Sequence, residues 1–143
     1  MIEDSLGYLV NRAARAFANR LANELRPFDV GIGQWAVLMH LWSNDGMTQA
    51  QLARRIAIEQ PTMVRTIDRM ERDGLVTRSP DPSDRRAIRI SLTERGSALR
   101  DQLVPLAAGV NRAATAALTA DEVITLRRLL AKLVAAEAGT LSA

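Results

Sequence analysis

The chain has 143 residues, of which 48% are hydrophobic and 24% are charged, and its formal net charge is +3. This length suits a single domain, and the lack of cysteine excludes disulfides, thiolate nucleophiles and cysteine-based redox sensing. No basic N-terminal region precedes an apolar run, and no stretch approaches the ~20 apolar residues that span a bilayer, so we expect a cytoplasmic protein without membrane contact.

The N-terminal third is expected to be helical. Apolar side chains recur at helical spacing over residues 6–25, which predicts one long helix that ends near Pro27. A second helix is expected at about 33–41, and the polar stretch 43–46 ends it as a turn. Because few residues are aromatic, the core must be built from aliphatic and methionine side chains, which favours packed helices.

Two short helices joined by a tight turn follow. Thr48 and Gln51 form a capping box, in which each side chain binds the other residue's backbone N–H, and they open the first of these helices. Residues 57–59 form the turn, and Pro61 suits the first turn of the next helix, which stops at Gly74. This arrangement predicts a helix-turn-helix.

A β-hairpin and further helices complete the chain. Strands are expected at 75–78 and 87–92, and the second alternates apolar and polar residues as one buried face requires. One helix is expected over 93–118, with a kink at Pro105, and a second capping box opens the last helix at Thr119.

The expected fold class is therefore mainly α with a small β-hairpin wing, in a single domain over residues 1–143. A winged helix-turn-helix lobe occupies residues 31–95, and residues 1–30 and 96–143 form a helical dimerisation region. The apolar faces of the first and last helices are too long for a small lobe to cover, so we expect a homodimer. The alternative is a pair of helices within one chain.

The helix after the turn has a basic face. At about 100° per residue, three arginines lie opposite three apolar side chains. These are Arg65, Arg69 and Arg72 against Met63, Ile67 and Met70. We expect the apolar side to anchor the helix and the arginines to face a DNA major groove. The alternative is an ordinary amphipathic surface helix, but the preceding helix and turn favour DNA binding.

The hairpin loop adds a second basic element. Arg85 and Arg86 end a loop that two prolines stiffen, and Asp84 is expected to hold the Arg86 guanidinium in place, because residues i and i+2 share a side of extended chain. Between Arg54 and Arg89, nine arginines stand against six acidic residues, so this stretch carries the net excess of positive charge and attracts a polyanion. A charged surface turn is the alternative.

Several sequence motifs in this region resemble those of a known protein family. The motifs are Ile58-Glu59-Gln60-Pro61-Thr62-Met63-Val64-Arg65-Thr66-Ile67-Asp68, Asp73-Gly74-Leu75-Val76, Asp84-Arg85-Arg86 and Ile90-Ser91-Leu92-Thr93. The chain resembles the MarR family of bacterial regulators, and residues 58–68 are most similar to its SlyA branch. The resemblance is specific over residues 35–96 and only architectural in the flanking helices.

The resemblance implies a homodimeric repressor that binds double-stranded DNA at a pseudo-palindromic operator, with recognition helices in major grooves about 34 Å apart. The DNA-binding residues that it implies are Gln60, Pro61, Thr62, Arg65, Arg69, Asp84, Arg85 and Arg86. Pro61, Thr62 and Arg65 would read the major groove, with Arg65 on a guanine. Arg86, oriented by Asp84, would enter the minor groove, and Arg85 would bind phosphate or share that groove.

The family also implies release by a small aromatic or carboxylate effector. Five residues are candidates to line its pocket: Arg15, Trp35, Met39, Met63 and Thr66. We prefer the simpler interpretation that these are ordinary core residues. No cofactor is expected, and the single histidine, His40, supplies too few ligands for a metal site.

Two other functional classes fit the sequence less well than DNA binding does. An enzyme is disfavoured because the chain has no glycine-rich phosphate loop, paired catalytic carboxylates or nucleophile–histidine pair. A winged helix used only for protein–protein contact would lack the basic helix face or the loop arginines, and this chain has both.

Overall fold

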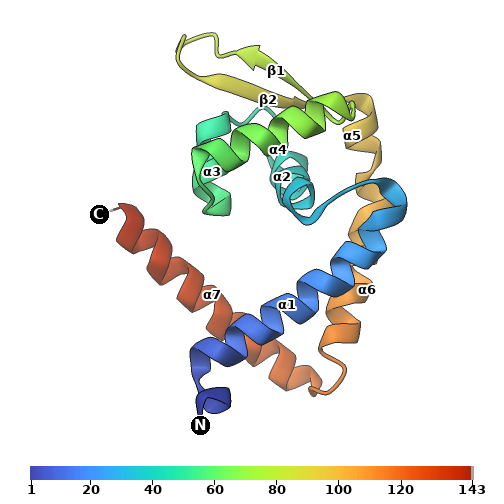
Figure 1. Cartoon of the computed structure of the whole chain (residues 1–143), viewed down its shortest axis with the longest axis vertical. Coiled ribbons are helices and arrows are strands. Elements are labelled where there is room, and N and C mark those ends of the chain that lie inside the picture. The colour runs from blue at the N-terminus through green and yellow to red at the C-terminus, as the bar shows by residue number, and fades with distance from the viewer. Residues whose placement is uncertain (143) are drawn as a thin grey trace.

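The computed structural model describes residues 1–142; Ala143, the end of the expected dimerisation region, lies outside the described residues. A lobe of short helices and a hairpin stands at one end, and longer helices extend away from it (Figure 1). The elements in chain order are η1 (Ile2–Asp4), α1 (Leu6–Leu25), η2 (Arg26–Phe28), α2 (Ile32–Ser43), α3 (Gln49–Ile56), α4 (Gln60–Arg72), β1 (Val76–Pro80), β2 (Ile88–Leu92), α5 (Glu94–Ala98), α6 (Arg100–Ala114) and α7 (Ala120–Ser142).

The expected helix-turn-helix is confirmed in its local chemistry. The Thr48 hydroxyl accepts the Gln51 N–H at 3.1 Å, and the Gln51 side chain accepts the Thr48 N–H at 2.9 Å. Ala57 then turns the chain with φ of 60°, a left-handed conformation that is uncommon without glycine. Gly74, with φ of 74°, ends α4 as predicted.

The core of the lobe lies beneath α4. The predicted anchor residues Met63, Ile67 and Met70 are fully buried, and Leu38 of α2 and Leu52 of α3 belong to the same cluster. The basic face of α4 is therefore held outward, because the opposite face is fixed in apolar contact.

The hairpin forms an antiparallel pair in which Val76 lies opposite Leu92 and Pro80 opposite Ile88. It is tied to the lobe, because the Ile90 N–H donates to the Met47 carbonyl at 2.9 Å. The first strand extends two residues beyond the range expected from sequence, since Ser79 and Pro80 also pair.

The prediction of one helix over 93–118 is wrong. The chain breaks between α5 and α6 at Leu99, and α6 ends at Ala114. Near the break, the Trp42 indole N–H donates a hydrogen bond to the Gly96 carbonyl at 3.0 Å, so this carbonyl binds α2. Pro105, where the kink was expected, lies inside α6.

The longer helices extend away from the lobe on one side (Figure 1). α1 and α6 pack along each other, and the N-terminal half of α7 lines a hollow together with both. The C-terminal end of α7 extends past α1 in Figure 1. Within the described residues, no helix is both long and apolar enough to cross a membrane.

Candidate nucleic-acid interface

The N-terminal half of α4 presents four of the predicted DNA-binding residues. Gln60, Pro61, Thr62 and Arg65 are all exposed, and Pro61 lies in the first turn as expected. The Arg65 guanidinium lies 3.4 Å from the Thr62 hydroxyl, a loose contact that leaves its remaining donors directed at solvent. This end of the helix can therefore offer hydrogen-bond donors to base edges.

Arg78 of β1 joins the recognition helix to its neighbours, a role that the sequence did not indicate. Its Nη1 donates to the Asp68 carboxylate at 2.6 Å, and its Nη2 donates to the Val64 carbonyl at 3.1 Å. Both Nε and Nη2 also lie 3.3 Å from Oε1 of Gln49 in α3, and the Arg78 side chain is only 20% exposed. One guanidinium thus fixes α3, α4 and the wing relative to one another.

We expect Arg78→Ala to lower the free energy of unfolding by about 2 kcal/mol, because hydrogen bonds to charged groups are lost and the Asp68 carboxylate loses its partner. Chemical denaturation measures this change. Arg72→Ala is the matched control: Arg72 lies on the exposed face of α4, and its replacement should change stability by less than about 0.5 kcal/mol. Equal stability of the two variants would contradict the proposed role of Arg78.

The wing holds its charged residues differently from the sequence prediction. Asp84 was expected to orient the Arg86 guanidinium, but its Oδ1 accepts the backbone N–H of Arg86 at 2.9 Å. The carboxylate therefore shapes the turn, and Arg86 is exposed. The reason is that the loop folds as a compact turn, in which a backbone N–H two residues on is the nearer donor.

A second aspartate stabilises the wing from inside. Asp81 is only 7% exposed, and its Oδ2 accepts the Ser83 hydroxyl at 2.8 Å and the Ser83 N–H at 3.1 Å. Its Oδ1 pairs with Nε of Arg89, whose Nη1 donates to the Gly46 carbonyl at 2.6 Å. The Ser83 hydroxyl, then the Ser83 N–H and Arg89, lower the pKa of Asp81 below its ordinary value of 3.8, although burial opposes them.

Because this pKa is lowered by folding, the Asp81 carboxylate stabilises the wing above pH 3.8, and that contribution is lost as the pH falls through the folded pKa. We expect the Ser83 amide resonance to leave its folded position on acidification before the resonances of core residues do. In Asp81→Asn this early transition should be absent. An unchanged acid transition in Asp81→Asn would show that another group governs the wing.

The structure does not bring the five candidate effector residues together. Trp35 and Met39 line one hollow of about 540 Å³ beside α6, whereas Thr66 lines another of about 560 Å³ next to Arg65. Met63 is buried in the core. Arg15 is exposed on α1 and lines neither hollow.

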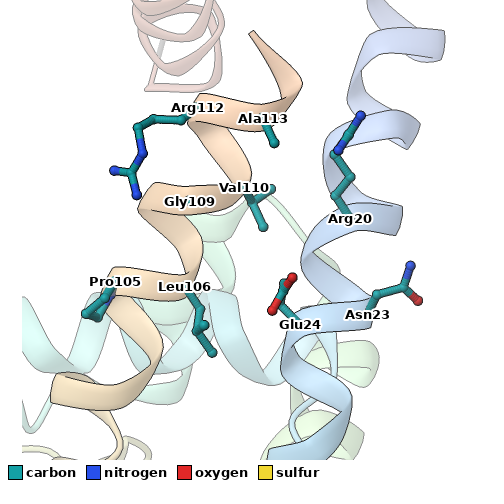
Figure 2. A pocket seen from close by; sticks show the side chains of 9 residues that line it. All are labelled: Arg20, Asn23, Glu24, Pro105, Leu106, Gly109, Val110, Arg112 and Ala113. Atoms are coloured by element: carbon teal, nitrogen blue, oxygen red, sulfur yellow. The ribbon is translucent and has the colours of Figure 1, made fainter. Parts of the chain in front are cut away.

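A further hollow, of about 520 Å³, lies between α1 and α6 (Figure 2). Glu24 of α1 points into the space between the helices, and Leu106 and Val110 of α6 point toward α1. None of the candidate effector residues lines it.

Three residues of this surface were missed from sequence. Arg78, Asp81 and Arg89 join segments that only the folded hairpin brings together. The available signal was the pairing of the strands, which places Arg89 opposite Ser79 and so within reach of the loop that contains Asp81.

Comparisons with known proteins identify relatives over most of the chain. Residues 32–88 match the model of the MarR family. A probable transcriptional regulator from Pseudomonas aeruginosa is 33% identical, with a TM-score of 0.85 over 93% of this chain and 99% of that one. A mutant MarR from E.coli, complexed with operator DNA, is 31% identical, with a TM-score of 0.83 over 90% of this chain and 92% of that one.

A third similar structure concerns regulation. It is that of BpsR from Bordetella bronchiseptica, whose DNA binding is regulated by 6-hydroxynicotinic acid. It is 25% identical to this chain, with a TM-score of 0.86 over 94% of this chain and 96% of that one.

Proposed function

The chain belongs to the MarR family of transcriptional regulators, and from this premise we propose that it is a repressor that binds a pseudo-palindromic operator as a homodimer. The observation that carries the proposal is the pair of exposed basic elements on one lobe, Arg65 on α4 and Arg86 on the wing. Similarity to a MarR protein complexed with operator DNA supports it.

In the proposed complex α4 enters the major groove by its N-terminal end. Arg65 binds a guanine edge, since its fork of donors matches two acceptors on that base. Pro61 and Thr62 lie beside it, and Gln60 and Arg69 reach the flanking backbone.

The wing follows the neighbouring minor groove. Arg86 enters where A·T pairs narrow the groove and deepen its negative potential, and Arg85 binds the adjacent phosphate. Asp84 keeps the turn in shape through the Arg86 N–H. Assignment to the SlyA branch stays a prediction, supported only by residues 58–68.

The homodimer is supported by apolar surface that the chain leaves uncovered. Large apolar side chains of α1 and α7 are exposed: Leu6, Leu9, Val10, Ile124, Leu129, Leu130, Leu133 and Val134. Soluble monomers rarely keep such patches uncovered, and a second copy related by a twofold axis covers the same patch on both chains.

We expect Leu133→Asp to weaken dimerisation at least about 100-fold, because a charge would be buried against apolar groups. Leu133 is 55% exposed in the single chain, so the substitution should destabilise the fold of one subunit only slightly. Sedimentation velocity over a concentration series measures the change. Val64→Asp, at a 38% exposed position on α4 of the winged lobe, is the control and should stay dimeric. Two variants with the same sedimentation behaviour would place the dimer contact elsewhere.

We also propose that a small aromatic carboxylate releases the DNA. Support comes from BpsR, whose DNA binding is regulated by 6-hydroxynicotinic acid. The hollow lined by Trp35 and Met39 is the better candidate pocket, because it combines apolar rings with the arginines Arg55 and Arg100.

A further inference from the structure

We propose that a hollow at the far end of α4 is a binding site for phosphate groups. The hollow measures about 770 Å³ and lies where the start of α2 meets the C-terminal end of α4. Four arginines from three separate elements line it: Arg26, Arg69, Arg72 and Arg95. Sequence reasoning had no means of finding this cluster, because Arg26 and Arg95 lie far from each other along the chain.

The positive charge of the cluster is not neutralised by ion pairs. Arg95 Nη1 donates to the backbone carbonyl of Asp73 at 2.9 Å, and Arg26 Nη2 donates to the amide oxygen of Asn23 at 3.1 Å. Both acceptors are uncharged, so they orient the guanidinium groups without cancelling their charge. Within residues 1–142, the ion pairs made by arginine are those of Arg78 and Arg89, elsewhere in the lobe.

The acidic groups nearby do not neutralise the charge of the four arginines. Asp29 and Asp73 also line the hollow, so two carboxylates stand against four guanidinium groups. The Asp73 carboxylate is engaged, since its Oδ2 accepts the Gln34 side-chain N–H at 3.1 Å. The hollow therefore keeps an excess of positive charge and donors.

Phosphate is the ligand chemistry that fits these donors. Guanidinium groups bind phosphate oxygens through paired N–H donors, and several arginines can share one phosphate. Two sources can supply the group: a small phosphorylated molecule, or the DNA backbone. The DNA backbone is a candidate source because Arg69 and Arg72 also line the adjoining hollow that contains Arg65 and Thr62. This second source rests on the proposed function, in which Arg65 and Thr62 bind DNA.

The first experiment uses pyrophosphate as the probe, at constant ionic strength and without DNA. Isothermal titration calorimetry is expected to show saturable binding to the full chain, weakened about ten-fold in Arg26→Gln, because one charge-assisted contact is lost. Arg95→Gln is the second variant and should weaken binding in the same way. A titration with chloride at the same ionic strength is the control for general charge screening. Arg112→Gln removes the same charge from α6 and should bind as the parent does.

The second experiment measures how operator affinity depends on salt. If the DNA backbone occupies the hollow, Arg26→Gln should lower the slope of log affinity against log salt by about 0.9 for each phosphate lost. If a free phosphorylated molecule occupies it, pyrophosphate binds and the slope stays unchanged. The site is overturned if pyrophosphate binding is the same in Arg26→Gln and Arg112→Gln and the slope is also unchanged. A chain that binds no operator would defeat the proposed function and leave the calorimetric test standing.

Discussion

Arg65→Ala is expected to weaken operator binding by about 2–6 kcal/mol, because a bidentate contact worth about 1–3 kcal/mol is lost in each subunit of the dimer. The loss should be selective. Operators with a substituted base at the contacted position should bind the variant as well as the original operator does, since nothing remains to discriminate between them. Gel-shift titrations on operator variants at fixed salt measure both effects.

Arg86→Ala provides the companion measurement. It should weaken binding and remove the preference for A·T pairs at the flanks, while base preference at the centre of each half-site stays as it was. Arg112→Ala, which removes an arginine of α6 outside the lobe, is the control for general charge. Unchanged affinity and selectivity in both Arg65→Ala and Arg86→Ala would defeat the assignment of the two grooves.

The second large effect concerns stability. We expect Gly96→Ala to lower the free energy of unfolding by about 3 kcal/mol or more, the upper end of the usual cost of overpacking. A Cβ added at Gly96 would lie 2.2 Å from the carbonyl oxygen of Leu75, a backbone atom that cannot turn aside. α5 would have to move away from β1, and the Trp42 bond to the Gly96 carbonyl would be strained as well.

Gly109→Ala is the matched control for this change. Gly109 also lies inside a helix, but the nearest atom to an added Cβ is the flexible Arg112 Nη2 at 3.7 Å. Alanine favours the helix, so stability should stay equal or rise by about 0.5–1 kcal/mol. Thermal and urea denaturation of both variants test the pair. A Gly96→Ala protein as stable as Gly109→Ala would mean that α5 does not approach Leu75 so closely.

Features set by neighbouring residues could be predicted from the sequence. The capping box at Thr48, the helix end at Gly74 and the buried face of α4 follow from residues within a few positions of one another, and each is confirmed. The winged fold followed because these local signals agree with the hairpin pattern.

Features set by distant residues could not be predicted. The break at Leu99 accompanies the contacts of Gly96 with Leu75 and Trp42, which no periodicity reveals. The role of Asp84 was mistaken because spacing alone does not distinguish a backbone N–H from a side chain as the donor. Arg78 was missed because its partners come from α3 and α4, which are distant from it along the chain.

Selection of bound sequences from a random duplex library tests the central claim most directly. The purified dimer should enrich a twofold-symmetric site whose half-sites lie about one helical turn apart, because two copies of α4 must enter successive major grooves. Recovery of sequences without symmetry, or binding of unselected duplexes as tight as that of the enriched site at physiological salt, would contradict the account.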